Sequence, residues 1–350
     1  MVQTRENYPA LDGLRGVSCI CIVMMHMRAA SCYTGGGYFW NSIIGTWEIT
    51  VFLFLMLSSF GMCVGYYDRF KEKTIDIETF YARRYKKLLP FFAVVLFIDV
   101  LSVKGEISHV IEAFMKMTML FGLLPNNALE TVGVSWTIGM IFVFYLLFPF
   151  FIFAIGNKRR AWFSFVIAML IHYTCFGYFY SEKFVDVAKF NHNTCFIGYC
   201  VVFVAGGLLY LYRHEIKVFG NLHPKMMLLG CIATTVMFYI SPDWIGNVDI
   251  RTIKRIILFA IVISYGISTK KSLLCSKPVR YIGSISLEIY LAHMMIFRIL
   301  EKLHLTTIFG NGLLGYIMCV VNVMIGLLVF IESFKCAERK VTLKISKAKQ

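Results

Sequence analysis

The sequence contains few charged residues and few acidic residues in particular. Asp, Glu, Lys and Arg together make up 16% of the 350 residues, whereas soluble domains carry roughly 25%. Only 20 residues are acidic, against 35 Lys and Arg, so the formal net charge is +15. A chain with so little charge is neither an ordinary water-soluble globule nor a disordered segment.

Several other signals are missing from the chain. None of the 11 cysteines forms a CxxC pair and most of them lie in apolar runs, so the chain carries no metal-binding or redox signature. We therefore expect no metal site and no permanently bound cofactor. No internal repeat or low-complexity run is visible. The N-terminus is weakly basic and leads into a long apolar run that contains charges, unlike a cleavable signal peptide.

What the chain has in excess is hydrophobicity. Hydrophobic residues make up 58% of it and the mean hydropathy is +0.69. A DNA-binding module of the same charge would have an ordinary apolar fraction, so we expect no nucleic-acid partner. The composition predicts an all-α polytopic membrane bundle, surrounded by lipids, with its basic residues in the loops of one side.

Ten segments are long and apolar enough to be predicted as spans, since a helix crosses the ~30 Å hydrocarbon core with about 20 residues. The shorter stretch Ile107–Leu124 contains Glu112 and Lys116 and ends at Pro125, and we interpret it as an interfacial or re-entrant helix. The ten spans are Leu11–Ala30, Trp47–Tyr67, Leu88–Val103, Ser135–Ile155, Ala161–Tyr180, Thr194–Tyr212, Met226–Ile240, Thr252–Ser268, Ser284–Leu300 and Gly312–Phe334.

The positions of the basic residues indicate an orientation, because short cytoplasmic loops are enriched in Lys and Arg. With a cytoplasmic N-terminus, 24 of the 35 cations fall on the cytoplasmic side and 8 on the other side, while Arg15, Arg28 and Arg298 lie within or at the ends of spans. We therefore expect a multi-pass protein of the inner (plasma) membrane with both termini in the cytoplasm. Residues 1–334 are expected to form one transmembrane domain and residues 335–350 a basic tail.

The first span contains three ionisable residues, Asp12, Arg15 and His26. The last two are eleven residues apart, which is about three turns plus 20° of an α-helix, so they share a face and lie about 16 Å apart along the axis. Asp12 can pair with Arg15 from three residues away. An Arg at the inner end suits a phosphate or carboxylate, and a His near the outer end suits a general base. Arg15 alone could simply snorkel to the interface, and His26 alone could be a packing residue. Their alignment on one face is less well explained in this way.

A second group of cations, Arg83, Arg84, Lys86 and Lys87, lies in Phe80–Pro90, which we interpret as a loop at the inner mouth of the third span. These residues suit the phosphates of a cytoplasmic nucleotide-bearing donor. Anchoring by the positive-inside rule explains them equally well.

A third group, Glu288, Tyr290, His293 and Arg298, lies in or beside the span Ser284–Leu300. For His293 we favour a hydrogen bond between helices over catalysis. His172, which has less polar sequence context, is expected to be structural.

Five stretches carry motifs that point in one direction. In Tyr8–His26, a basic residue is followed by ten residues and His. Phe52–Phe60 reads as a Phe-rich run ending in Ser-Ser-Phe, and Arg83–Pro90 as a basic run before Leu-Pro. Trp136–Pro149 contains Trp-Thr-Ile, Phe-Tyr-Leu and Pro, and Ile285–His293 contains Ser-x-x-x-Tyr-Leu-x-His. Together these stretches resemble the motifs of the membrane acyltransferase 3 family, whose members include O-acetyltransferases of bacterial surface polysaccharides.

The resemblance implies a reaction. An acyl-CoA, usually acetyl-CoA, would donate its acyl group from the cytoplasm to a hydroxyl of a cell-surface polysaccharide or lipid-linked sugar. The inner cations Arg15, Arg83, Arg84, Lys86 and Lys87 would bind the donor. His26 would act as general base, which we favour over a covalent acyl carrier, with Arg15 and Asp12 beside it in the catalytic set. Acceptor-contacting or pore-lining positions would be Trp136, Tyr145, Tyr290 and His293.

One departure from the family pattern matters for the mechanism. The family often has a Glu five residues after the Trp of this span, and here Ile141 takes that place. No step is therefore assigned to that carboxylate. The alternative to an enzyme is a secondary transporter or flippase of a lipid-linked or anionic metabolite, which predicts repeated halves that the sequence does not show. An inert structural protein does not explain the aligned Arg15 and His26.

Overall fold

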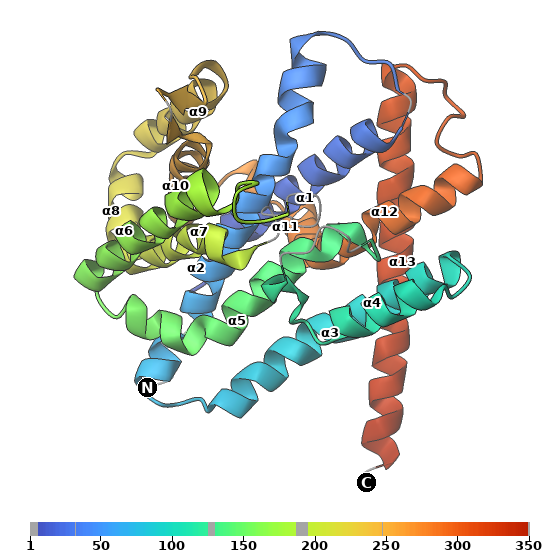
Figure 1. Ribbon diagram of the computed structural model, residues 1–350, viewed down its shortest axis with the longest axis horizontal. Coiled ribbons are helices and arrows are strands. Elements are labelled where there is room, and N and C mark those ends of the chain that lie inside the picture. The colour runs from blue at the N-terminus through green and yellow to red at the C-terminus, as the bar shows by residue number, and fades with distance from the viewer. Residues whose placement is uncertain (1–5, 32, 125–129, 187–194, 247, 349–350) are drawn as a thin grey trace.

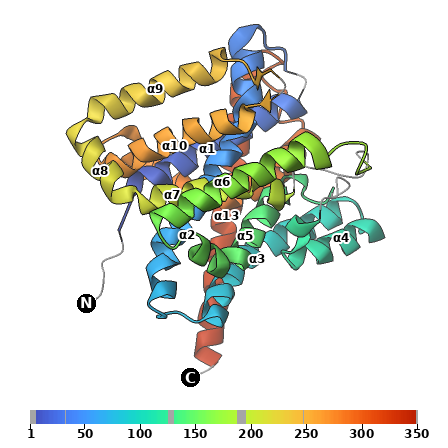
Figure 2. The same ribbon diagram turned by 60° about the vertical axis from the view of Figure 1, so that its left-hand side comes forward.

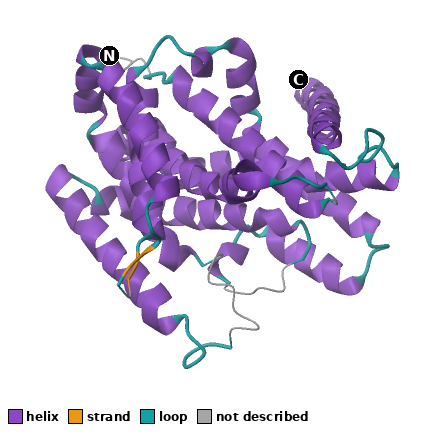
Figure 3. Ribbon diagram, turned by 90° about the horizontal axis from the view of Figure 1, so that it is seen from above, coloured by secondary structure: helices purple, strands orange, loops and turns teal. Residues whose placement is uncertain are grey.

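The computed structural model describes residues 6–31, 33–124, 130–186, 195–246 and 248–348. Helices dominate throughout, and the strands β1 (Trp244–Ile245) and β2 (Val248–Asp249) form one short antiparallel hairpin (Figure 3). The α-helices in chain order are α1 (Pro9–Ala30), α2 (Thr50–Lys71), α3 (Ile77–Ser102), α4 (Ile107–Met117), α5 (Trp136–Ala154), α6 (Lys158–Thr174), α7 (Phe196–Leu211), α8 (Arg213–Leu222), α9 (Pro224–Ile240), α10 (Arg251–Ser268), α11 (Lys277–Ser284), α12 (Ser286–Lys302) and α13 (Leu313–Ala348).

Shorter helical turns connect several of these helices. They are the π-turns η1 (Phe39–Ile43) and η5 (Cys175–Phe179) and the 3₁₀ turns η2 (Ile44–Ile49), η3 (Phe121–Leu123), η4 (Gly133–Ser135) and η7 (Leu273–Cys275). η1 and η2 continue into α2 and make a single apolar stretch of 33 residues, Phe39–Lys71.

The all-α membrane architecture agrees with the prediction, but the count of ten spans is not confirmed. Within the described residues, five helical stretches are long and apolar enough to cross a bilayer, and seven if each of two bent pairs counts as one span. Each predicted span still coincides with a helix. The others fall short because α9 has 17 residues and because cations stand at the start of α10 and beside the apolar part of α3.

The stretch Ile107–Leu124 does not form a crossing helix. Its helix α4 has 11 residues, about 16 Å at 1.5 Å per residue, which is half of the ~30 Å hydrocarbon core. Ile107 and Phe114 are exposed on one side of it. On the other side the Lys116 ammonium is buried and lies 2.9 Å from the Glu112 carboxylate. The helix is therefore short and amphipathic, as a non-crossing segment requires.

Helix α1 lies at the centre of the bundle, packed against α2, α10, α11 and α12 (Figures 1 and 2). The contact with α11 is very close, because a Cβ added at Gly283 would stand only 1.8 Å from the carbonyl oxygen of Asp12. The chain then turns by 74° between α11 and α12. This packing fixes the first turns of α12 beside the first half of α1.

The last helix of the chain includes most of the segment predicted to be a basic tail. From Lys335 onward the segment continues α13 as one 36-residue helix, and its last part extends beyond the neighbouring helices (Figures 1 and 2). Tyr281 of α11 donates a 2.6 Å hydrogen bond to Glu332, and Phe91 of α3 packs edge-on against Phe334. These contacts hold α13 against the bundle up to the point where the basic segment begins.

Candidate active site

A cavity of about 660 Å³ opens among α1, α2, α3, α5, α11 and α12. Its wall combines apolar and polar side chains and includes residues from the segment before α1. Glu6 holds this segment in place, because its carboxylate accepts hydrogen bonds from the Tyr8 hydroxyl (2.5 Å) and from Arg213 Nε (3.1 Å). Burial opposes ionisation of Glu6, but these two bonds outweigh it and lower the pKa of its carboxyl group.

Arg15 projects into this cavity from α1. Its guanidinium lies 3.3 Å from the Asp12 carboxylate and donates a 3.0 Å hydrogen bond to the carbonyl oxygen of Leu57 in α2. Gly61 leaves room for it, since a Cβ there would be 2.9 Å from Arg15 Nη2. The guanidinium is thus held between α1 and α2 while it still faces the cavity.

The basic cluster lies in a helix, which corrects its interpretation as a loop. Asp76 accepts a 2.6 Å hydrogen bond from the backbone of Thr79 and caps α3, which begins at Ile77 and continues past Pro90. Residues three apart share a helix face. For this reason the four cations divide into two pairs.

One of the two pairs faces the cavity. Arg84 and Lys87 line it, whereas Arg83 and Lys86 do not. Arg84 also donates a 2.6 Å hydrogen bond to the Tyr66 hydroxyl. The structure therefore brings together three of the five cations expected at a donor site, Arg15 included.

The aromatic positions separate in a similar way. Tyr145 and Tyr290 line the cavity, but Trp136 packs into the core beside it. The hydroxyls of Tyr290 and Thr137 lie 2.6 Å apart at the cavity wall. Ile141, at the family's Glu position, lines the cavity too and makes that part of the wall apolar.

His26 and His293 form a pair next to the part of the cavity wall that contains Tyr290. His26 Nδ1 lies 2.8 Å from His293 Nε2, and the two rings stack with centroids 4.8 Å apart. His293 is completely buried, and its Nδ1 lies 2.7 Å from the carbonyl oxygen of Tyr290. Tyr290 connects the histidine pair to the cavity, because its ring lies 5.9 Å from the ring of His293 and the residue also lines the cavity.

These contacts set the protonation pattern of the neutral pair. A carbonyl oxygen only accepts hydrogen bonds, so His293 Nδ1 carries the hydrogen that it shares with Tyr290. Its Nε2 is then unprotonated and accepts from His26 Nδ1–H. In this tautomer His26 Nε2 keeps a free lone pair, which is the property that a general base requires.

Sequence reasoning found both histidines but not their contact. They are 267 residues apart. His293 makes the hydrogen bond between helices that we favoured for it, but it is not among the residues that line the cavity, where the resemblance would put it. The sequence also provided no reason to select Thr137, Ser58 or Tyr66, whose hydroxyls contact cavity side chains. The one available signal for Thr137 was its place directly after Trp136. His172 is buried and hydrogen-bonds the Gly198 carbonyl at 2.5 Å.

Comparison with known proteins identifies the chain. An acyltransferase domain family model matches residues 8–332, which include the cavity, the cations and both histidines. The chain belongs to the acyltransferase 3 family. The same comparison found no curated protein and no solved structure that matches this chain. The protein is thus a multi-pass membrane acyltransferase, and the family favours acyl transfer over the transporter alternative.

Proposed function

We propose that this acyltransferase moves an acyl group, acetyl by default, from cytoplasmic acyl-CoA to a hydroxyl of a cell-surface polysaccharide or lipid-linked sugar. The charge bias of the loops supports an inner-membrane protein with both termini in the cytoplasm. In that orientation the mouth of the cavity, beside the start of α1, faces the cytoplasm where acyl-CoA is found.

The donor's phosphates bind at the mouth of the cavity in this proposal. Arg84 and Lys87 project from one face of α3 into it, and Arg15 lies deeper between α1 and α2. A planar guanidinium makes bidentate hydrogen bonds to phosphate, and an ammonium adds a point charge. The pantetheine arm then runs along the apolar wall that includes Ile141.

His26 removes the proton from the acceptor hydroxyl through its Nε2. The acceptor oxygen forms a bond to the thioester carbonyl carbon, and the C–S bond of the resulting tetrahedral intermediate breaks. The CoA thiolate leaves and takes up the proton that His26 holds. The products are the acylated sugar and free CoA, and His26 is again neutral.

Two hydroxyls at the cavity wall suit the negative oxygen of the intermediate. Thr137 and Tyr290 together carry two hydroxyl hydrogens, and their mutual 2.6 Å bond uses only one of them. The second is available to donate to the thioester oxygen as it gains charge, which is how oxyanion holes stabilise transition states.

The observation that carries the proposal is the His26–His293 contact, which Tyr290 connects to the wall of a cation-lined cavity. The test is His26→Ala in purified protein, measured as CoA release from labelled acyl-CoA in the presence of an acceptor glycan. We expect activity to fall by about 10²–10⁴-fold, the usual contribution of a general base. His172→Ala, a buried histidine away from the cavity, is the matched control.

Wild-type CoA release by the His26→Ala variant would refute the role of His26. A base and a covalent carrier are distinguished by incubating the protein with labelled acyl-CoA and no acceptor. A base leaves the protein unlabelled, whereas a carrier retains label that the His26→Ala variant lacks. Absence of CoA release from the wild-type protein with every glycan tested would favour the transporter alternative.

A further inference from the structure

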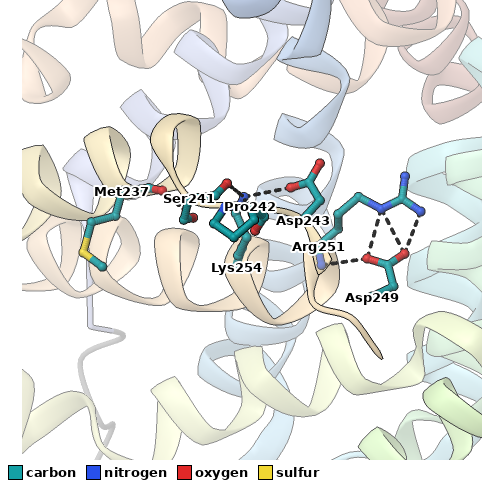
Figure 4. Close-up of polar contacts among 7 residues, drawn as sticks. All are labelled: Met237, Ser241, Pro242, Asp243, Asp249, Arg251 and Lys254. Atoms are coloured by element: carbon teal, nitrogen blue, oxygen red, sulfur yellow. Dashed lines mark hydrogen bonds and ion pairs between the residues drawn. The ribbon is translucent and has the colours of Figure 1, made fainter. Parts of the chain in front are cut away.

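Three cations open helix α10, and two of them have partners in the preceding hairpin (Figure 4). Arg251 binds the Asp249 carboxylate through Nε and Nη2 at 2.6–3.0 Å, and Lys254 Nζ lies 2.8 Å from Asp243 Oδ1. Arg255 differs from both. In the part of the chain that the structure describes, its guanidinium has no carboxylate within 4.0 Å, and its buried Nε has no hydrogen-bond partner.

Arg255 lies well inside the length of the bundle. Its guanidinium carbon is 4.8 Å from the centre of the Phe52 ring in α2. Thr50, two residues earlier, donates a 3.4 Å hydrogen bond to the carbonyl oxygen of Ser18, which is close to the middle of α1 (Pro9–Ala30). Arg255, the fifth residue of α10, is therefore a half-buried cation whose guanidinium packs beside the part of α2 that contacts the middle of α1.

An unpaired guanidinium in this position is costly. A charged side chain within a membrane helix is costly, and such residues usually face a partner or a functional site. The Phe52 ring covers one face of the guanidinium, but the N–H groups of arginine lie in its plane. Those donors therefore require an acceptor that approaches from the side.

We propose that Arg255 binds an oxyanion, a phosphate or carboxylate group, that belongs to the acceptor. This rests on the proposed function and narrows its acceptor to an acidic sugar or a sugar phosphate. A guanidinium fork matches both groups. The buried Phe52 ring, which packs edge-on against Tyr199, holds one face of the guanidinium in place and leaves its edge for the ligand.

The nearest acidic side chains agree with an anionic ligand from outside the chain. Asp249 is already held by Arg251, so its charge is neutralised within the hairpin. Glu48 influences Arg255 electrostatically but lies beyond ion-pair distance. An incoming oxyanion thus has no close competitor for the guanidinium among the described residues.

The test measures binding and needs no turnover. The full chain is placed in nanodiscs of phosphatidylcholine, and its thermal unfolding midpoint is measured with sodium glucuronate or glycerol phosphate against sodium chloride of equal ionic strength. Either anion is expected to raise the wild-type midpoint by about 2–4 °C at tenfold excess over its dissociation constant. Arg255→Gln should lose this shift, while Arg251→Gln, the matched neighbour with an internal partner, should keep it.

Each other outcome overturns the assignment. No shift in the wild-type protein, or an equal shift in Arg255→Gln, refutes the site. A shift that depends on Arg255 but appears only with phosphatidylglycerol in the nanodisc assigns the anion to a lipid headgroup and refutes the acceptor. An Arg255→Gln midpoint below the wild-type value without any added anion shows a structural role, because loss of an unpaired charge should not destabilise the fold.

Failure of this inference and failure of the proposed function give different results. CoA release reports on the transfer reaction and the thermal shift on the anion site. An Arg255-dependent shift in a protein that never releases CoA would refute acyl transfer and leave the anion site in place.

Discussion

The hydrogen bond between His293 and His26 gives the sharpest prediction. His293→Leu fills most of the buried volume but removes the acceptor for His26 Nδ1–H, which lies 2.8 Å away. The His26 ring is then free to turn and to place its hydrogen on Nε2, the atom that must accept the substrate proton. A lost hydrogen bond is worth about 0.5–1.5 kcal/mol, or up to roughly tenfold in rate, and the wrong tautomer costs more. We expect kcat to fall about 10–100-fold.

Two further variants separate this effect from simple loss of packing. In His293→Gln the amide oxygen can accept from His26 while the amide nitrogen donates to the Tyr290 carbonyl, so part of the lost kcat should return. In His26→Ala, adding His293→Leu should cause little further loss, because the second residue acts only through the first.

The assay is steady-state CoA release with acyl-CoA and acceptor glycan varied separately, after membrane abundance has been matched. KM for acyl-CoA should change less than about threefold, since neither histidine lines the donor cavity; a positioning residue affects kcat most. Additive losses in the double variant, or His293→Gln as inactive as His293→Leu, would refute the tautomer argument.

Three other predictions concern the donor site, the N-terminal segment and the packing of α1. Arg84→Met should raise KM for acyl-CoA about tenfold, the worth of a charge-assisted hydrogen bond, whereas Lys86→Met on the exposed face of α3 should leave it unchanged; equal effects would disprove the division of the cluster. Because the folded pKa of Glu6 is lowered, its stabilisation is present above its unfolded pKa and is lost as pH falls through the folded value. The free energy of unfolding should therefore change less between pH 7 and pH 3 in Glu6→Gln than in the wild type. The two changes should differ by up to about 1 kcal/mol, because the ion pair is partly exposed. Gly283→Ala places a Cβ 1.8 Å from the Asp12 carbonyl oxygen, which should cost more than about 3 kcal/mol and show as loss of folded protein in detergent; normal yield would contradict this packing.

The sequence was sufficient to predict the helices of the bundle, because long apolar runs and the distribution of cations are local properties. It was less informative about which helices are long enough to cross a bilayer. Helix α9 ends before 18 residues, and a 74° turn beside Gly283, which packs closely against α1, separates α12 from α11. Such breaks are set by packing and leave no hydropathy signal.

In the candidate site too, features within one helix could be predicted from the sequence, whereas contacts between helices could not. The periodicity of one helix was enough to align Arg15 with His26, and a spacing of three would have separated Arg84 and Lys87 from Arg83 and Lys86 once the segment was recognised as helical. No local pattern reveals that His293 lies against His26, since this contact joins α1 to α12 across 267 residues. Nor does the pattern show that Arg255 has no carboxylate partner among the described residues, because Arg251 and Lys254 beside it have theirs.

The backbone contact between Gly283 and Asp12 has a consequence for motion. With a carbonyl oxygen seated where a side chain would be, α1 and α11 cannot slide past one another, and the first turn of α12 is carried with them. The cavity therefore has one rigid wall, formed by these helices, and an opposite wall formed by α3 and α5, which make no comparable glycine contact with α1 in the described chain. Widening of the cavity during substrate entry therefore requires movement of α3 and α5. A label on Tyr145 should report this movement, and a label on Ser284 should not move.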